Sequence, residues 1–408
     1  MKNVFLAVAL FFAFAGAGDG PVSYYGKLQA SGNNIVGSNT GGTAVQLRGV
    51  SFGWSNVNWE SGRFYKDVSV DRVVKDWKAE VVRAAYGETG VIFEHSTADK
   101  NRTSVETVVD AAIANDIYVI IDWHSHKAEN EVENSTDFFK YMAEKYGSSD
   151  NVIFEIYNEP IGTPWATVKT YAETIIPVIR AHSSNLILVG TPNYSQKVAD
   201  VVGNAIADPN VGYVVHFYAY THPLSNFQNN INTALNAGLP IFVTEWGSTH
   251  SDGGQSNTNP SHYDTHNAAR SDEWHAFMDE KKISSAAWEI NDKYAGSAFF
   301  GIEGAAKQFP IDDAAAWVDL NRMTPEGQYV FKKLNEYSKT APWKNGQTPI
   351  KPLATENLAI NGDASLEIFS LQGKKMGSMS NFSNLKAGVY ILFQNQGSKT
   401  KSVKIVKK

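Results

Sequence analysis

Val152-Ile-Phe-Glu-Ile-Tyr-Asn-Glu-Pro160 is an apolar run that ends abruptly in a polar tripeptide. Its β-branched and aromatic residues are typical of a parallel strand that is covered on both faces. A second run, Pro240-Ile-Phe-Val-Thr-Glu-Trp-Gly247, has the same form and carries a glutamate near its end. The two runs predict that Glu159 and Glu245 stand at the carboxyl ends of buried strands.

Eight strands of this kind are expected, and they alternate with amphipathic helical patterns. The expected strands are Val45–Val50, Val81–Ala84, Ile117–Asp122, Val152–Ile156, Leu186–Val189, Val211–His216, Ile241–Glu245 and Ser285–Glu289. The helical stretches are Val70–Lys78, Thr103–Ala114, Phe138–Tyr146, Trp165–Ala181 and Asp272–Lys282. This strict alternation predicts an α/β fold, a (β/α)8 TIM barrel rather than an open sheet.

Polar or aromatic side chains stand at or just past the ends of most of these strands. They are Arg83, His124, Asn158, Glu159, His216, Tyr218, Glu245 and Trp288. Barrels of this class build their sites at the carboxyl ends of the strands. We therefore expect these side chains to meet in one cleft.

The composition is that of an ordinary globular protein, with 43% hydrophobic and 19% charged residues in 408. The net charge of −6 argues against nucleic acid and anionic membranes as partners. Aromatic residues make up 12% of the chain, and the faces of Trp and Tyr can stack on sugar rings as well as pack in a core. Because the chain has no cysteine, disulfides, thiolate catalysis and cysteine metal ligands are excluded.

The sequence also suggests how the chain is divided. Residues 1–18 have the positive start, apolar core and small-residue site of a secretory signal. Residues 19–338 hold the expected catalytic barrel, and the polar, proline-bearing residues 339–352 are expected to be a linker. Residues 353–408 carry short strand-like runs punctuated by glycine, which are Leu366–Phe369, Val389–Phe393 and Val403–Val406, and they predict a small C-terminal β module.

Two glutamates in this arrangement are suited to breaking a glycosidic bond. One carboxyl must be protonated to give the leaving oxygen a proton, and the other must be ionised to attack the sugar carbon. We assign Glu159 as the acid/base, with Asn158 beside it to hold a substrate hydroxyl, and Glu245 as the nucleophile. The carboxyl groups are then expected about 5–5.5 Å apart, which predicts double displacement with retention of configuration.

Other strand residues are expected to support this pair. An arginine inside a barrel needs a carboxylate partner, so we expect Arg83 to bind Glu245 and keep it ionised. His216 and Tyr218 are expected to contact the two glutamates and help to set their pKa values. Glu155 has the inward parity of its strand, and we interpret it as a structural buried carboxylate.

The segment Asp122-Trp-His-Ser-His126 offers an alternative, because two histidines at a barrel strand end can bind a metal. A metal-dependent amidohydrolase needs further ligands at other strand ends, where Asn158-Glu159 and Glu245-Trp246 stand in this chain. We therefore expect no metal site. His124 is interpreted as a hydrogen-bonding partner of a sugar hydroxyl or of the nucleophile region.

Two tryptophans are candidate platforms for sugar rings. Trp288, at the end of the last expected strand, is expected to form the floor of the subsite for the attacked sugar, although a core role is equally open from its position alone. Trp54, after the first expected strand, is a weaker candidate.

Taken together, these segments resemble glycoside hydrolase family 5 (cellulase family A), most closely its bacterial endo-β-1,4-glucanase branch. The resemblance rests on Leu47-Arg-Gly-Val-Ser51, Val82-Arg-Ala-Ala85, Ile120-Ile-Asp-Trp-His124, Phe154-Glu-Ile-Tyr-Asn-Glu-Pro160, Val215-His-Phe-Tyr218, Ile241-Phe-Val-Thr-Glu-Trp-Gly247 and Trp288-Glu-Ile-Asn-Asp-Lys293. It implies the same roles for the two glutamates, supporting roles for the other strand-end residues, and contact between Lys293 and a substrate hydroxyl. It also implies that no cofactor is required.

Three segments depart from the pattern of that family. Trp288-Glu-Ile-Asn-Asp-Lys293 places an extra carboxylate, Glu289, near the cleft, and Tyr86-Gly87 replaces an aromatic-rich run. Ser51-Phe-Gly-Trp54 lacks the histidine that some members have there. These changes affect contacts with the glucan chain more than the chemistry, so they leave the substrate preference open.

The C-terminal module is similar to the β-rich sorting domains of some Gram-negative exporters. The similarity rests on Leu366-Glu-Ile-Phe-Ser-Leu-Gln-Gly373, Leu385-Lys-Ala-Gly-Val-Tyr390 and the lysine-rich end. It implies a protein that is secreted or held at the cell surface of a Gram-negative bacterium. A carbohydrate-binding module is the weaker alternative, because the segment contains no tryptophan.

The sequence therefore predicts a secreted, monomeric endo-β-1,4-glucanase that acts on β-glucan polysaccharides, without binding nucleic acid or inserting in a membrane. A β-mannanase, a mixed-linkage glucanase or a xyloglucanase would share the catalytic pair and differ in the shape of the cleft. A non-catalytic glycan-binding barrel would lack one of the glutamates, and this chain has both.

Overall fold

The computed structural model describes residues 20–56, 59, 61–87, 95–254, 261, 265–301 and 308–345, with the backbone of four further strands between 365 and 407. The chain divides into two compact units, one formed by Met1–Ser38 and Gly42–Thr348, the other by Asn39–Gly41 and Pro349–Lys408. The predicted secretory signal, residues 1–18, lies outside the described residues. Among the described residues, no helix has both the length and the apolar content needed to cross a membrane.

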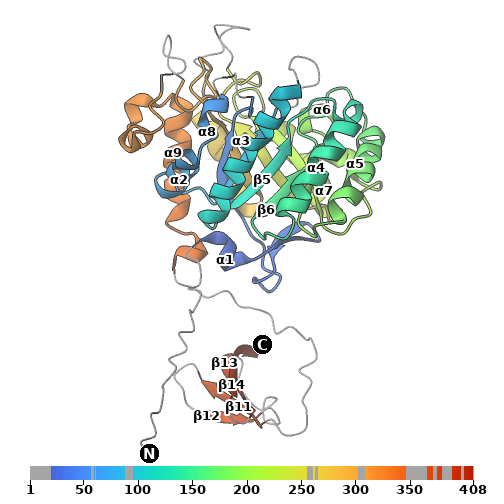
Figure 1. Cartoon of the computed structure of the whole chain (residues 1–408), viewed down its shortest axis with the longest axis vertical. Coiled ribbons are helices and arrows are strands. Elements are labelled where there is room, and N and C mark those ends of the chain that lie inside the picture. The colour runs from blue at the N-terminus through green and yellow to red at the C-terminus, as the bar shows by residue number, and fades with distance from the viewer. Residues whose placement is uncertain are drawn as a thin grey trace, which may run out of the picture. The chain divides into compact units, whose positions relative to one another are not determined.

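The first unit is a closed barrel of parallel strands surrounded by helices (Figure 1). Its strands are β3 (Arg48–Phe52), β4 (Val81–Tyr86), β5 (Tyr118–Trp123), β6 (Val152–Glu155), β7 (Ile187–Val189), β8 (Val211–Tyr218), β9 (Ile241–Gly247) and β10 (Ser284–Ile290). They pair in chain order, and β10 closes the barrel against β3. The predicted (β/α)8 barrel is confirmed.

The first barrel strand begins at Arg48, later than the predicted Val45–Val50. The reason is that Val45 donates its backbone N–H to Ile35 O (2.8 Å) and so pairs with an N-terminal hairpin. This hairpin consists of β1 (Leu28–Ser31) and β2 (Asn34–Gly37), preceded by the short helix α1 (Pro21–Tyr25). Its apolar side chains pack with those that fill the barrel interior near the amino-terminal ends of the strands. The hairpin therefore closes that end of the barrel.

Helices cover the outside of the barrel (Figure 1). They are α2 (Asp67–Lys75), α3 (His95–Ala114), α4 (Val132–Tyr146), α5 (Trp165–Arg180), α7 (Gln228–Asn236), α8 (Ala268–Lys281) and α9 (Pro325–Ser338), while α6 (Pro192–Ser195) is a single turn in the loop after β7. Short 3₁₀ turns are Ser61–Phe64, Ala128–Asn130, Val198–Val201, Leu224–Asn226, Ala314–Val318, Leu320–Arg322 and Pro342–Asn345. The sequence did not predict α7, whose polar sequence QNNINTALN buries only Ile231, Ala234 and Leu235.

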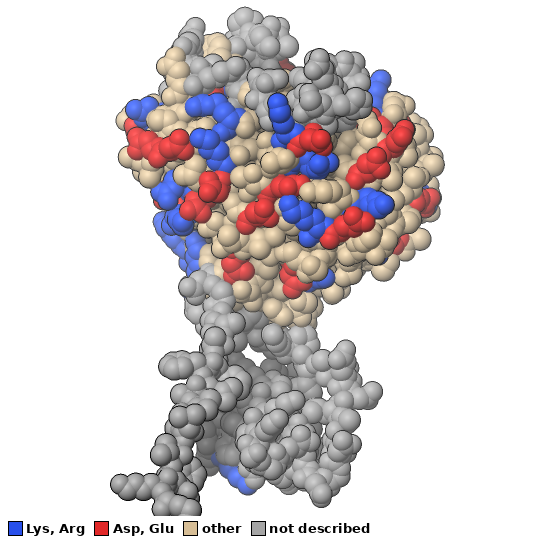
Figure 2. All heavy atoms as spheres, in the orientation of Figure 1, with Lys and Arg blue, Asp and Glu red and all other residues tan. Residues whose placement is uncertain are grey.

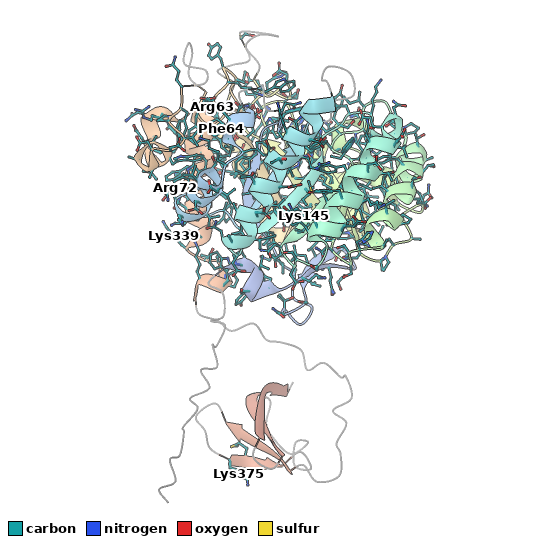
Figure 3. All side chains as sticks on the ribbon, in the orientation of Figure 1. Arg63, Phe64, Arg72, Lys145, Lys339 and Lys375 are labelled. Carbon is teal, nitrogen blue, oxygen red and sulfur yellow. The ribbon has the colours of Figure 1, made fainter. Side chains whose placement is uncertain are left out.

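Helices α2, α4, α5 and α9 bury an apolar stripe and carry charged residues on their exposed side. In α4, for example, Phe138, Phe139 and Met142 are buried. Figure 3 shows Lys145 on the same helix, where it pairs with Glu106 of α3 (2.9 Å). Lys/Arg and Asp/Glu side chains are interspersed on the face in Figure 2, which agrees with the modest net charge.

Two layers of side chains fill the barrel interior. The layer near the amino-terminal ends of the strands is apolar, and the layer nearer their carboxyl ends is charged. Ile153 of β6 lies in the apolar cluster at the bottom, and Glu155, two residues later, faces the same way one layer higher. The same step leads from Val81 to Arg83 in β4 and from Ile120 to Asp122 in β5. The charged side chains therefore meet inside the barrel toward the carboxyl ends of the strands.

The barrel unit continues past the predicted end of the catalytic domain at residue 338. Trp343, in the 3₁₀ turn after α9, packs on the lower apolar cluster and donates its indole N–H to Glu80 (2.5 Å). This turn is therefore part of the barrel unit, and the unit boundary falls within the predicted linker 339–352.

The second unit contains a four-stranded antiparallel sheet in the order β12-β11-β13-β14. These strands are β11 (Ser365–Ser370), β12 (Lys375–Ser378), β13 (Gly388–Gln396) and β14 (Lys399–Lys407). The predicted runs Leu366–Phe369, Val389–Phe393 and Val403–Val406 fall within β11, β13 and β14. The role proposed for this unit in sorting stays a prediction.

The packing between barrel and helices gives a test of stability. Trp77, after α2, is fully buried, donates its indole N–H to Trp317 O (2.8 Å) and stacks on Phe299. Trp77→Ala should lower the free energy of unfolding by about 3–5 kcal/mol, as expected when a large core side chain is removed. Leu320→Ala, at a side chain that is 47% exposed, should change it by less than about 0.5 kcal/mol. Urea denaturation of the two variants measures both values, and equal losses would contradict the assigned core.

Candidate active site

The residues predicted from the sequence converge at the carboxyl ends of the barrel strands. They surround one cleft of about 650 Å³. The predicted residues that line it are Trp54, His124, Asn158, Glu159, His216, Tyr218, Glu245, Trp288 and Lys293. Arg83 lies beneath the cleft, fully buried and bonded to Glu245.

Two glutamates face each other across the cleft. Glu159 follows β6 and Glu245 belongs to β9, on the other side of β7 and β8 in the barrel. A carboxylate oxygen of Glu159 and one of Glu245 lie within 4.8 Å of each other. The side chain of Glu159 is 13% exposed and that of Glu245 is 7% exposed, so both reach the cleft from a largely buried position.

Both oxygens of Glu245 accept hydrogen bonds from side chains that stay protonated. Tyr218 donates its hydroxyl to Oε1 (2.7 Å), and Arg83 donates from Nη1 to Oε2 (3.1 Å). Burial and the neighbouring Glu245 raise the pKa of Tyr218 well above its usual value. The bond from Arg83 was predicted from the sequence, and the structure contains it. These two donors fix the plane of the carboxylate and stabilise its ionised form.

Arg83 binds more than one carboxylate. Its Nε lies 2.8 Å from Glu155 Oε2, and its Nη2 lies 2.9 Å from Asp122 Oδ2 and 2.6 Å from Asn158 Oδ1. Asp122, Glu155 and Glu245 therefore share this one guanidinium, and the first two have no exposed side-chain surface. Burial therefore raises the pKa of Asp122 and that of Glu155 to about 7, despite the attraction of Arg83.

Glu159 has a different kind of partner. Its Oε1 lies 2.8 Å from His216 Nδ1, and its Oε2 lies 3.3 Å from His126 Nε2. Burial opposes the ionisation of Glu159, but the contacts with these two histidines outweigh it and lower its pKa. Since an imidazole and a carboxyl can exchange a proton, the Glu159–His216 pair is best described as holding one proton in common.

Aromatic rings form the wall between the two glutamates and the first strand. The rings of His124 and Trp288 are stacked, with centroids 5.1 Å apart and an interplanar angle of 4°. Trp54 meets His124 edge-on at 4.5 Å. His124 Nδ1 is bonded to Asp122 (2.7 Å), and burial followed by the charge of Arg83 holds the pKa of His124 well below its usual value.

Lys293 reaches the cleft from the segment after β10 and is tied to a buried carboxylate. Its Nζ pairs with Glu289, which is fully buried. Asn291 donates its side-chain amide to the other oxygen of Glu289 (3.2 Å). The extra carboxylate noticed in the sequence is therefore the anchor of the cleft lysine and does not itself line the cleft.

Several residues of the site were not assigned from the sequence. Asp122 and Thr244 are buried within the network around Arg83, and His126 contacts Glu159. The loops after β7 and β9 add further lining residues, which are Asn193, Tyr194, Gln196, Ser251, Asp252 and Gly253. The inward parity of Asp122 and the long polar loop that begins at Ser251 are signals in the sequence, whereas Asn193, Tyr194 and Gln196 carry no pattern that points to a cleft.

The histidine pair considered as a metal site is divided between two carboxylates. His124 binds Asp122, and His126 binds Glu159. Within the described part of the chain, the one group of ligand-type side chains close enough to hold an ion is Glu159, His216 and Glu245. Two of these three, Glu159 and Glu245, are the side chains expected from the sequence to act as the catalytic pair.

Comparison with known proteins agrees with this geometry. Residues 38–294 match the family model for cellulase, glycosyl hydrolase family 5. The chain belongs to this family. It is 39% identical to endoglucanase Z of Dickeya dadantii over 85% of this chain and 74% of that protein. It is 36% identical to an endoglucanase of Clostridium saccharobutylicum over 78% of this chain and 67% of that protein.

Solved structures of similar proteins share the fold. A protein of Cytophaga hutchinsonii is 36% identical, with a TM-score of 0.69, over 78% of this chain and 97% of that one. The catalytic domain of Thermobifida fusca endoglucanase Cel5A, solved in complex with cellotetraose, is 29% identical with a TM-score of 0.67, over 78% of this chain and 99% of that one. The predicted family and fold, and the prediction that the chain is a glycoside hydrolase, are confirmed.

The shared guanidinium leads to a pH-dependent prediction. Arg83→Met leaves buried carboxylates without a cation and should lower the free energy of unfolding by about 3–5 kcal/mol at pH 7. Asp122 and Glu155 have folded-state pKa values of about 7, above their usual 3.8 and 4.5. The folded state therefore binds more protons than the unfolded state between these values, and the free energy of unfolding falls as the pH rises toward 7. The loss caused by Arg83→Met should therefore be smaller at pH 5, where these groups take up protons.

Urea denaturation at the two pH values measures this difference. Arg180→Met is a matched control, because Arg180 binds Asp208 (2.7 Å) near the surface and lowers its pKa. Asp208 stays ionised at both pH values, so the loss in that variant should not change between them. An equal loss for Arg83→Met at pH 5 and pH 7 would contradict the shared-charge description.

Proposed function

We propose that this protein is an endo-β-1,4-glucanase that hydrolyses internal bonds of cellulose-type chains by double displacement. Glu245 is the nucleophile and Glu159 is the acid/base. The observation that carries the proposal is the approach of their carboxylate oxygens to within 4.8 Å across the cleft. Inverting glycosidases need a wider separation, about 6.5–9.5 Å, to admit a water between carboxyl and sugar, so this separation supports retention.

In the first step, Glu245 attacks the anomeric carbon while Glu159 gives its proton to the leaving glycosidic oxygen. Tyr218 and Arg83 hold the two oxygens of Glu245, so that the attacking carboxylate is ionised and correctly aimed before the sugar arrives. Glu159 takes the proton that it shares with His216 Nδ1. The products are a glycosyl ester on Glu245 and a shortened glucan chain.

In the second step, a water replaces the departed chain beside Glu159. Glu159, now ionised, accepts a proton from this water as the oxygen attacks the anomeric carbon, and the bond to Glu245 breaks. The two inversions leave the configuration unchanged, and Glu159 regains its proton for the next cycle. Arg83 and Tyr218 again stabilise the carboxylate of Glu245 as it leaves.

The cleft also has groups for holding the sugar. Trp288 lines it between the two glutamates and β3, with His124 stacked on the ring, so it can form the floor of the subsite for the attacked sugar. Lys293 is held by Glu289 and can donate to a substrate hydroxyl. The names of the relatives and the cellotetraose in the Thermobifida fusca structure support a β-1,4-glucan as the substrate.

The roles of the glutamates can be separated with two leaving groups. Glu245→Gln should abolish turnover of every substrate, because no covalent intermediate can form. Glu159→Gln should lower kcat/KM on cellooligosaccharides by about 10²–10⁴-fold, but change it little on 2,4-dinitrophenyl cellobioside, whose leaving group needs no proton. Circular dichroism checks that both variants fold, and retained turnover in Glu245→Gln would refute the nucleophile assignment.

The substrate preference can be measured with a panel of polysaccharides. Carboxymethylcellulose, barley mixed-linkage glucan, xyloglucan and mannan are compared at equal concentration. We expect carboxymethylcellulose to be cleaved, with a fall in viscosity that precedes the release of most reducing ends, as internal cleavage requires. Mannan as the best substrate, with the same catalytic pair, would reject the glucanase and favour a mannanase.

A further inference from the structure

A chain of hydrogen bonds connects Glu159 with a carboxylate that does not reach the cleft. His216 Nδ1 lies 2.8 Å from Glu159 Oε1, and His216 Nε2 lies 2.9 Å from Thr244 Oγ1. Thr244 donates its hydroxyl to Glu155 Oε1 (2.7 Å). Thr244 and Glu155 are fully buried and His216 is 1% exposed, so the chain is open to the cleft only at its Glu159 end, where the side chain is 13% exposed.

An irregularity in β9 brings Thr244 into this chain. Val214 of β8 pairs with Phe242, but His216, two residues later, pairs with Glu245, three residues later on β9. This extra residue is a β-bulge, and it lets the consecutive residues Thr244 and Glu245 both face the interior, where regular alternation would turn one of them away. The pairing with β10 shifts at the same place.

The hydrogens in this chain can be assigned from the acceptors. A threonine hydroxyl has one hydrogen, and Glu155 takes it as an acceptor. Thr244 Oγ1 therefore receives a hydrogen bond from His216, which fixes a proton on Nε2. Only Nδ1 is left to exchange a proton with Glu159, so the chain determines which ring nitrogen faces the acid/base.

We propose that Thr244 and Glu155 are positioning residues for the acid/base step, a role that rests on the function proposed above. They hold the His216 ring with Nδ1 toward Glu159, and the negative charge of Glu155, transmitted through the Thr244 hydroxyl, stabilises the proton that His216 and Glu159 share. Glu159 can then act as an acid up to a higher pH than it could if the Glu159–His216 pair had no contact with Thr244 and Glu155.

The charged surroundings of His216 agree in sign with this role. Glu155 and Glu159 approach it from the β6 segment, Glu245 from β9, Asp122 from β5, and Arg83 from β4. Burial and Arg83 oppose a charge on the ring, but the carboxylates outweigh them and raise the pKa of His216. Glu155 becomes fully ionised only above its own pKa of about 7, so its contribution grows in the pH range where the shared proton would otherwise be lost.

The test is the pH dependence of kcat/KM in Thr244→Val, which keeps the shape of the side chain and removes the hydroxyl. On cellotetraose, whose leaving group needs the acid, the basic limb of the profile should move down by about one pH unit. On 2,4-dinitrophenyl cellobioside, which needs no acid for the same step, the profile should not move. Thr244→Ser restores the hydroxyl and should restore the basic limb.

Thr191→Val is the matched control, because Thr191 is also fully buried and donates its hydroxyl to Val214 O (2.9 Å) outside this chain. Its basic limb should stay in place. Should Thr244→Val not fold, Glu155→Gln removes the charge with little change of shape and should lower the basic limb in the same way. A basic limb that stays in place in the folded variant, or moves equally on both substrates, would overturn the proposal.

A second measurement does not depend on turnover. Nitrogen NMR of the full chain labelled in histidine should show Nε2 of His216 protonated above the basic limb, and Thr244→Val should abolish this preference. A proton on Nδ1 alone in the unaltered protein would overturn the proposal. Absence of hydrolysis of any β-glucan by the unaltered protein would instead reject the proposed function, and the nitrogen spectrum would still report the hydrogen-bond chain.

Discussion

The placement of Arg83 among three carboxylates is the constraint on which the site depends. Asp122, Glu155 and Glu245 come from three different strands, and each is bonded to the same guanidinium. A buried carboxylate without a cation would be protonated or would destabilise the fold. Arg83 therefore sets the position of the strands that carry these groups and the charge of the carboxylate that reaches the cleft.

Closure of the barrel is what makes this sharing possible. The strands β4, β5, β6 and β9 supply the charged layer, and regular alternation turns Arg83, Asp122 and Glu155 toward the interior. The bulge in β9 is the exception, since it turns two consecutive side chains inward. In this way one strand supplies both the Glu245 carboxylate and a hydroxyl that bonds to His216.

Much of this could be predicted from the sequence, for physical reasons that can be named. Apolar runs followed by polar residues indicated both the barrel and the face on which Glu159 and Glu245 lie, because parallel strands bring their carboxyl ends together. The hydrogen bond from Arg83 to Glu245 followed from the cost of an unpaired buried charge.

What could not be predicted depends on contacts between distant segments. The start of β3 was misplaced because Val45 pairs with an N-terminal hairpin, a contact that no local pattern reveals. Thr244 was missed because strict alternation would direct it and Glu245 to opposite faces, and only the register between β8 and β9 shows the bulge. The loop residues of the cleft, such as Tyr194, likewise have positions set by tertiary structure.

The different chemistry of their partners explains how two glutamates at such a short distance can have opposite roles. Glu245 receives hydrogen bonds from Arg83 and Tyr218, whose pKa values are raised, so neither donor gives up its proton to the carboxylate. Glu159 is bonded to His216, which can give and take a proton in the range where an enzyme works. A carboxyl with fixed donors is suited to attack, and one with an exchangeable partner is suited to proton transfer. The assignment of roles thus follows from the neighbours of each glutamate, in addition to its place in the family motif.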